Sequence, residues 1–279
     1  GWARYTLDQE GLDYTLIADA DLRRGGLENR FDVILFPNQF EGFSDAVFGI
    51  DPANGPLPFS KSDAFPSQGI PDGADDITGG MGLEGLINLR RFVEKGGVLV
   101  ALDNAGVVPV EGGMVRRVAA SGGPNTPGSE VRAKVLRPEH PIAYGFEERT
   151  SVFRGNGPIY DVADRDRGWV VMQFGTKKVG EEEPPKKEEP IEVEDADLPD
   201  EPPAANNKPE APAAKEDDRL VLSGLIKDTG AVDGKPAILD VPSGQGRVIL
   251  FSFNPLHRYL NLSDFRFVWN ALLNWNDLP

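Results

Sequence analysis

A helix that leads directly into a fully apolar strand is the feature that most restricts how this chain folds. Residues 82–97 place apolar side chains at helical spacing, and Gly96 follows where a helix C-terminus is expected. Residues 98–102, Val-Leu-Val-Ala-Leu, then form an uninterrupted apolar run of strand length. A similar run at 31–37 precedes the helix. Strand, helix and strand in this order favour parallel strands joined by a crossover helix, and hence an α/β fold.

Further apolar segments predict that the sheet continues along the chain. Residues 237–242 and 246–253 are joined through Ser-Gly-Gln-Gly and predict a β-hairpin. Residues 263–275 carry apolar side chains at helical spacing and predict a C-terminal helix with Ser263 as its N-cap. The other predicted elements are a short helix at 2–10 and strands at 14–19, 129–136, 150–155, 158–163 and 169–175.

Two segments interrupt this pattern. Residues 38–80 are rich in Gly, Pro, Asp and Ser and predict a long loop, whose Phe side chains either line a ligand groove or fold back as a small apolar cluster. Residues 176–218 form an acidic insert rich in Pro and Glu, which we expect to be disordered because it has no aromatic side chain to bury. Residues 1–175 and 219–279 are expected to form a single α/β domain.

The net charge of −16 comes mainly from this insert. Residues 181–218 contain 15 acidic residues and four lysines, which together account for −11. We expect this stretch to be a solvated tether; binding of a basic partner or of Ca²⁺ is the alternative, but the spacing of a Ca²⁺ loop is absent. The rest of the chain is only mildly acidic, so it lacks the basic surface that nucleic acid binding needs.

The sequence contains no cysteine and no long apolar run. The absence of cysteine excludes a thiol nucleophile, a Cys-ligated metal and disulfide bonds. No apolar run approaches the roughly 20 residues needed to cross a bilayer, so no membrane span is predicted. The sequence begins without Met, and we therefore expect it to be part of a longer protein whose targeting signal lies upstream.

Polar side chains follow two of the predicted strands. Asp103 and Asn104 come directly after residues 98–102, at the edge where open α/β sheets bind ligands. Asp103 is a candidate carboxylate nucleophile or ligand, but we favour the alternative that both residues cap and shape the turn. His257 is a candidate base or metal ligand, and Arg258 a candidate carboxylate-binding residue. Ordinary loop and ion-pair roles are the favoured alternatives for these two.

Several segments, taken in their order and spacing, resemble a known family. They read FDVILFP at 31–37, FVEKGGVLVALDNA at 92–105, HPIAYGF at 140–146 and PAILDVPSGQGRVILFSFNPLHR at 236–258. Together they resemble the amidotransferase-like domain found C-terminal to the catalytic domain of bacterial zinc carboxypeptidases of the carboxypeptidase A-like family. The resemblance implies a flavodoxin-like, class I glutamine amidotransferase-like α/β fold, with a mostly parallel sheet flanked by helices.

The sequence departs from this superfamily at the positions that carry glutaminase chemistry. Working members have a G-x-C-x-G nucleophile turn and a later F-H-P-E segment. Here Asp103 stands in a turn without cysteine, and the later segment reads Phe-Asn-Pro-Leu, with Asn254 in place of His and Leu256 in place of Glu. Because glutaminase chemistry needs a thiolate beside a base, the resemblance implies that this reaction is lost.

Zinc is expected only in an upstream peptidase domain. The catalytic domains of the zinc carboxypeptidases carry an H-x-x-E pair, but here His140 is followed by Pro-Ile-Ala and His257 by Arg-Tyr-Leu. We therefore predict no metal site and no cofactor for this segment. His140 precedes Pro141 and instead predicts a rigid turn.

The resemblance, together with the replaced catalytic residues, thus implies a non-catalytic accessory or interaction domain of a zinc metallocarboxypeptidase-like protein, packed against the peptidase domain of the same chain. The resemblance implies a secreted or periplasmic location. One alternative is a hydrolase with replacement chemistry at Asp103 and His257. Another is a peptide- or glycan-binding module that uses the vestigial cleft. The candidate binding residues are Asp103, Asn104, Asn254, His257 and Arg258.

Overall fold

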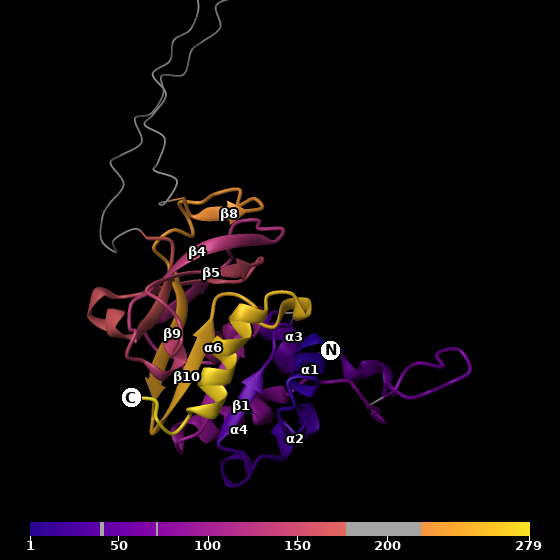
Figure 1. Cartoon of the computed structure of the whole chain (residues 1–279). Helices are drawn as coiled ribbons and strands as arrows, with labels where there is room; N and C mark the ends of the chain where they lie inside the picture. Colours follow the sequence, from indigo (N-terminus) through magenta and orange to yellow (C-terminus); the bar gives the residue numbers. More distant parts are fainter. Residues whose placement is uncertain (40–41, 71, 177–218) are drawn as a thin grey trace, which may run out of the picture.

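A computed structural model describes residues 1–39, 42–70, 72–176 and 219–279 and shows a mixed eight-stranded sheet flanked by helices (Figure 1). The strand order is β1-β2-β10-β9-β7-β4-β5, with β8 also paired to β4, and β3 and β6 form a separate ribbon. The strands are β1 (Val33–Phe36), β2 (Val98–Leu102), β3 (Val118–Ser121), β4 (Ser129–Val135), β5 (Arg149–Arg154), β6 (Ile159–Val162), β7 (Val170–Phe174), β8 (Val221–Ser223), β9 (Pro236–Ser243) and β10 (Gly246–Phe251). The helices are α1 (Trp2–Gln9), α2 (Asp19–Arg24), α3 (Phe43–Phe48), α4 (Gly82–Glu94), α5 (Val107–Glu111) and α6 (Leu262–Leu273).

Parallel pairing is confined to one side of the sheet. β2 lies between β1 and β10, and both run parallel to it, with Val98 opposite Val33 and Arg247. The pairings from β10 outward to β5 and β8 are antiparallel. The prediction of a mostly parallel sheet is met for these three strands only, and the sheet as a whole is mixed. The predicted tight hairpin between β9 and β10 is confirmed. Because two strands joined by a short turn can only run antiparallel, whereas parallel strands need a long crossover, this hairpin makes the sheet mixed.

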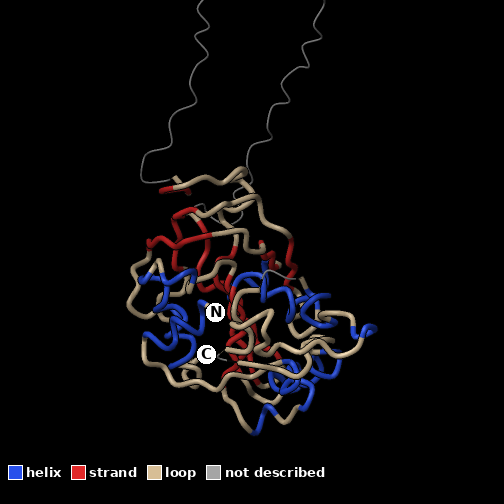
Figure 2. Tube along the Cα trace, turned by 90° about the vertical axis from the view of Figure 1, so that its right-hand side faces the viewer, coloured by secondary structure: helices blue, strands red, loops and turns tan. Residues whose placement is uncertain are grey.

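β2 is buried on both faces. Val98, Val100 and Leu102 enter the core beneath α6, and the two residues between them enter a second core beneath α4. Because successive strand residues point to opposite faces, an uninterrupted apolar strand requires that both faces be covered. Figure 2 shows this layering, with the strands in the middle and helices on either side. The α/β class predicted from the sequence is confirmed.

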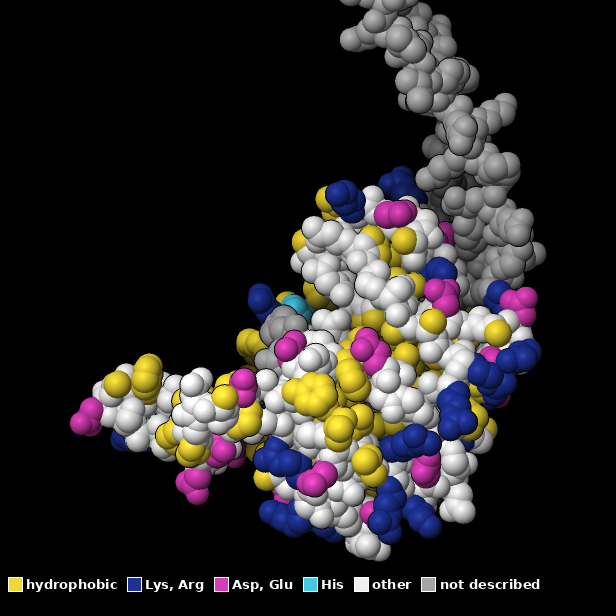
Figure 3. All heavy atoms as spheres, turned by 180° about the vertical axis from the view of Figure 1, so that it is seen from behind, with side chains coloured by type: hydrophobic (Ala, Val, Ile, Leu, Met, Phe, Trp, Pro, Cys, Tyr) yellow, Lys and Arg dark blue, Asp and Glu magenta, His cyan; other side chains and the backbone are white. Residues whose placement is uncertain are grey.

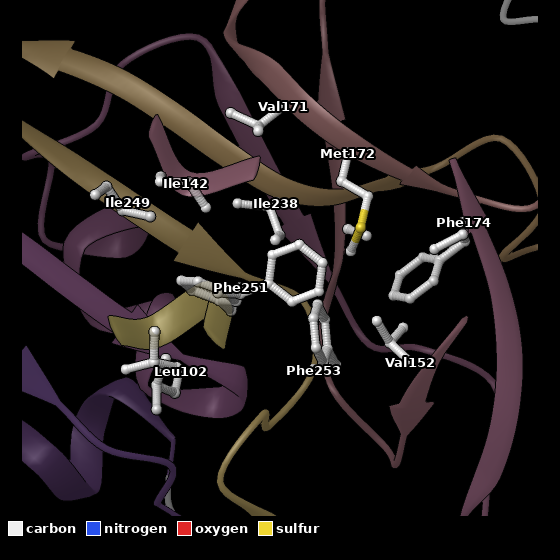
Figure 4. Close-up of a cluster of buried hydrophobic side chains, with 14 of the residues drawn as sticks. Leu102, Ile142, Val152, Val171, Met172, Phe174, Ile238, Ile249, Phe251 and Phe253 are labelled. Carbon is white, nitrogen blue, oxygen red and sulfur yellow. The ribbon is translucent and has the colours of Figure 1, made fainter. Parts of the chain in front are cut away.

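The core beneath α6 is rich in aromatic side chains, several of which are shown in Figure 4. Phe251 ends β10, and its ring lies 5.7 Å from that of Phe253, centroid to centroid. Phe253 also contacts the rings of Phe174 and Phe267. Since each fully buried side chain of this size contributes about 1.5–3 kcal/mol, this cluster holds the carboxyl end of β10 firmly in place.

Three local predictions differ from the structure. Residues 14–19 form no strand and do not pair with the edge strand β1, and the side chains of Tyr14 and Leu16 remain 38% and 53% exposed. α6 begins one residue earlier than predicted, and Asn261 rather than Ser263 occupies its N-cap position. The ribbon strand β3 and the short helices α3 and α5 were not predicted.

The predicted loop at 38–80 contains α3 and an arm, which we define as residues 50–70 and 72–78. The arm begins at a bridge between Ile50 and Thr78, and a second bridge joins Phe59 to Ala74. It projects from the body beside α3, and apolar side chains lie along it (Figures 1 and 3). The predicted fold-back into an apolar cluster is wrong for the arm, because Phe59 and Phe65 are exposed.

Apart from Thr176, the acidic insert at 176–218 lies outside the described residues, so its predicted disorder stays a prediction. Strands from both 1–175 and 219–279 are hydrogen-bonded in the same sheet. Within the part of the chain that the structure describes, no helix has the length and apolar character that crossing a bilayer requires.

Candidate functional site

The turn after β2 has the backbone conformation of a strained elbow. Asp103 opens a 3-10 turn that spans Asp103–Gly106, and its φ is 55°. This left-handed region costs a residue with a side chain about 1–2 kcal/mol, because Cβ approaches the following carbonyl oxygen. Such strain persists only where the surroundings impose it, and it is frequent at functional sites. This is the turn that the sequence analysis named as a candidate site.

The side chain of Asp103 is buried, with 6% of its surface exposed. A Cβ atom on Gly157 would lie only 2.3 Å from the Asp103 Oδ1 atom, so the backbone of Gly157 packs directly against the carboxylate. This Oδ1 atom has no hydrogen-bond partner within the described residues. Arg154, at the end of β5, acts electrostatically on Asp103, and Asp103 in turn acts on Tyr160, in β6. We call Asp103, Arg154, Tyr160 and Ser252 the elbow cluster.

Arg154 is fully buried, and both Nη atoms of its guanidinium group donate to backbone carbonyls, whereas Nε has no partner among the described residues. Nη1 donates to the Ser252 carbonyl at 2.7 Å and to the Ser252 hydroxyl at 3.2 Å, and Nη2 donates to the Gly157 carbonyl at 2.9 Å. The guanidinium also lies over the ring of Phe174, 4.9 Å from its centroid. Arg154 therefore ties β5 to the residue that follows β10, directly beneath the elbow.

Tyr160 closes the elbow cluster from the side of β6. Its side chain is fully buried, and its hydroxyl has no hydrogen-bond partner among the described residues. A Cβ atom on Gly106 would lie 1.9 Å from this hydroxyl oxygen. The last residue of the elbow turn must therefore be glycine, because the phenol occupies the place of any side chain there. Burial raises the pKa of Tyr160 well above its ordinary value.

The pKa of Asp103 is raised by burial from 3.8 to about 6, and the positive charge of Arg154 offsets this only in part. The native state therefore binds a proton more tightly than the unfolded chain. Between pH 4 and pH 6 the native state holds the extra proton, so the free energy of unfolding falls as the pH rises through this window. Ionised Asp103 thus destabilises the fold at neutral pH.

Asp103→Asn should remove this penalty, because asparagine has the shape of the neutral acid. Since one pH unit corresponds to about 1.4 kcal/mol, the variant should match the wild type near pH 4 and exceed it by about 3 kcal/mol near pH 8. Urea unfolding at both pH values measures this. Asp63→Asn, at an exposed arm carboxylate, is the matched control and should show no such difference. A variant less stable than the wild type near pH 8 would contradict the prediction.

Asp264 is a second buried acid that the sequence did not single out. It lies in the first turn of α6, and its Oδ2 atom accepts a hydrogen bond from the Phe153 amide at 3.0 Å. Burial raises its pKa to about 7. The wild type is therefore expected to lose stability over a pH range that extends above the window set by Asp103.

The other predicted site residues do not join the elbow cluster. The Asn254 Oδ1 atom accepts a hydrogen bond from the Leu256 amide at 3.1 Å and shapes its own turn. The His257 ring stacks on Phe153, with 4.8 Å between centroids, and burial together with Arg258 lowers its pKa. Side chains at 153 and 154 point to opposite faces of β5. The structure therefore brings Asp103 to Arg154 and Tyr160, and within the described residues no hydrogen bond or ion pair joins Asp103 to His257.

Asn104 and Arg258 have no role in the cluster. Asn104 is half-buried, and Arg258 is exposed in a turn with positive φ at Arg258 and Tyr259. The sequence analysis missed Arg154, although one signal was present. Arg154 lies two residues after Val152 in a predicted strand, so both side chains point to the same, core-facing side, where a charged group needs a buried partner.

His140 has the structural role that the sequence predicted. It is buried at the N-cap of a short 3-10 turn, and its Nδ1 atom accepts a hydrogen bond from the Ile142 amide at 3.2 Å. Its Nε2 atom therefore carries the proton and donates to Asp240 at 2.8 Å. Asp240 also pairs with Arg247. In the described ranges, no three His, Asp or Glu side chains gather closely enough to hold a metal ion.

Comparisons with known proteins give little guidance. No family model matches the chain, and no curated protein matches it. Among solved structures, a cytoplasmic protein from Salmonella typhimurium is similar over 98% of this chain and 85% of its own, at 13% identity and a TM-score of 0.43. Similarity this low carries no argument about fold or function, so the functional conclusion depends on the site itself.

Proposed function

We propose that this chain is a non-catalytic, amidotransferase-like accessory domain of a bacterial zinc carboxypeptidase-like protein that is secreted or periplasmic. The family resemblance of the sequence supports the context. The parallel strands β1, β2 and β10, with a strained turn after the middle strand, support a flavodoxin-like ancestry for this part of the sheet. Its partner is the peptidase domain of the same parent protein.

The observation that carries the proposal is the closure of the elbow. In a working amidotransferase the nucleophile at this turn faces an open site. Here Asp103 is 6% exposed, and glycine backbone packs against its carboxylate. The two Nη atoms of Arg154 donate to the Ser252 and Gly157 carbonyls. Burial, and not hydrogen bonding, therefore closes Asp103 and Tyr160 off from a substrate.

One observation favours a second candidate, a hydrolase with replacement chemistry. Asp103 combines a strained φ with a pKa of about 6, a combination found at catalytic carboxylates. In this case Arg154 and Tyr160, rather than His257, would be its partners. The accessory function is the better supported of the two, because burial alone accounts for the raised pKa and, among the described residues, no base is hydrogen-bonded to Asp103.

Hydrolysis assays separate the two candidates. The isolated chain should release no ammonia from glutamine and should not cleave hippuryl-phenylalanine, a carboxypeptidase substrate. The full-length parent protein should cleave the latter through an upstream H-x-x-E domain, and Asp103→Asn should leave its kcat/KM unchanged. If the isolated chain hydrolyses either substrate and Asp103→Asn abolishes the activity, the accessory function is wrong.

A further inference from the structure

A pocket with a volume of 420 Å³ lies beyond the carboxyl end of β1, apart from the elbow cluster. It is bounded by the first residue of α2, by α3, by the base of the arm and by the residues before α4, which Figure 1 shows grouped on the same side of the body. Its volume is typical of small-molecule sites, and the carboxyl edge of parallel strands is where open α/β folds bind ligands. The lining residues are Asp19, Gln39, Asp45, Ala46, Gly49, Ile50, Ile77, Gly80 and Met81.

Two glycines fix one wall of this pocket. A Cβ atom on Gly49 would lie 2.4 Å from the Gly80 amide nitrogen, and a Cβ atom on Gly80 would lie 2.7 Å from the Val47 carbonyl oxygen. Both glycines also have positive φ, of 57° and 50°. The Met81 amide donates to the Ala46 carbonyl across the same contact at 3.1 Å. The wall is therefore a close backbone contact, and its shape is set before any ligand arrives.

The polar side chains of the pocket suit a cationic donor. Asp19 and Asp45 contribute two carboxylates, and Gln39 contributes an amide. No Lys or Arg is among the lining residues; Arg23 reaches the Gly80 carbonyl and is held there by a hydrogen bond. Asp45 accepts one hydrogen bond, from the Gly42 amide at 3.3 Å, and a carboxylate has capacity for more. Asn38, which precedes Gln39, keeps a buried side-chain oxygen without a partner in the described part of the chain.

The apolar side chains of the pocket suit an aliphatic stem. Ile50 and Ile77 stand at the base of the arm and remain 48% and 37% exposed. They lie on the pocket together with Ala46 and Met81, whose side chains continue into the core beneath α4. A ligand with methylene groups would therefore cover exposed apolar surface while its charged end reaches the carboxylates.

We infer that this pocket binds a primary ammonium or guanidinium group carried on a short aliphatic stem, the chemistry of a lysine or arginine side chain. A charged donor meets two carboxylates, and the stem meets the isoleucines. The cation comes either from a free amino acid or from a basic residue of a peptide. This inference is independent of the proposed function, because it uses none of the residues of the elbow cluster.

Calorimetric titration of the isolated chain tests the inference. The probes are n-butylamine, L-lysine and the peptide Gly-Gly-Lys-Gly-Gly, with norleucine as the neutral match for L-lysine. The amines should bind and norleucine should not. Tighter binding of the peptide assigns a protein side chain as the source, and tighter binding of L-lysine assigns the free amino acid. The inference is overturned if no amine binds or if norleucine binds as well as L-lysine.

Variants then locate the site. Asp45→Asn should weaken amine binding about tenfold, because one charged hydrogen bond is lost. Asp75→Asn, at an exposed arm residue outside the lining, is the matched control and should change nothing. Ile77→Lys places an ammonium at the partly exposed edge of the pocket and should abolish binding, even if Asp45→Asn disturbs α3. Equal effects of Asp45→Asn and Asp75→Asn, or full binding by Ile77→Lys, would overturn the assignment.

Discussion

Replacing Gly106 by alanine is expected to lower the free energy of unfolding by about 2–3 kcal/mol. The new Cβ atom would lie 1.9 Å from the Tyr160 hydroxyl oxygen and 3.5 Å from a methyl group of Leu250, so either the ring or the turn must move. The backbone itself tolerates alanine, since Gly106 has a φ of −65°. Urea unfolding measures the loss of stability. Because the backbone conformation suits alanine, the loss measures only the steric contact with Tyr160 and Leu250.

Tyr160→Phe provides the matched control. By itself it should be close to neutral, because the buried hydroxyl has no partner in the described structure. Combined with Gly106→Ala it should recover at least half of the lost stability, since the closest remaining contact is 3.2 Å, to the Tyr160 Cζ atom. A double variant as unstable as Gly106→Ala alone would show that the phenol does not fill the elbow.

Arg154→Met is expected to cost about 3–5 kcal/mol, the effect of removing one partner from a buried charged network. Methionine fills much of the volume but leaves the Ser252 and Gly157 carbonyls without their donors. It also removes the positive charge that offsets the burial of Asp103. Urea unfolding near pH 7 measures the loss.

Two further variants distinguish this network from ordinary packing. Arg149→Met, at the exposed start of the same strand, should change stability by no more than about 0.5 kcal/mol. Adding Asp103→Asn to Arg154→Met should restore part of the loss, because asparagine does not need the positive charge. A loss below about 1 kcal/mol for Arg154→Met would contradict the account of a buried tie between β5 and β10.

The part of the fold that the sequence predicts well is the part controlled by local periodicity. The helix predicted at 82–97 corresponds to α4, and the apolar run at 98–102 corresponds to β2. The apolar stripe of α4 packs on one core, and the uninterrupted apolar run of β2 fits a strand that is covered on both faces. Residues 14–19 were also predicted as a strand but form none, and β1 remains the edge of the sheet. Pairing with distant strands decided that case, and local sequence does not contain this information.

The candidate site was predictable only in part for the same reason. Asp103 follows an apolar strand directly, so its place at the sheet edge follows from the pattern. Arg154 and Tyr160 come from the antiparallel half of the structure, and only its mixed topology brings them beneath the elbow. His257 was paired with Asp103 on the basis of residue type, but its ring stacks on Phe153 instead.

The central claim is that no substrate reaches the elbow, and a single introduced thiol tests it most directly. The chain has no cysteine, so Asp103→Cys creates its one reactive thiol, in the turn after β2. The account predicts that Ellman's reagent modifies this thiol only after unfolding in urea, at least about 100-fold more slowly in the native state than the thiol of Ser62→Cys on the exposed arm. Native-state modification as fast as that of Ser62→Cys would show an open site and contradict the account.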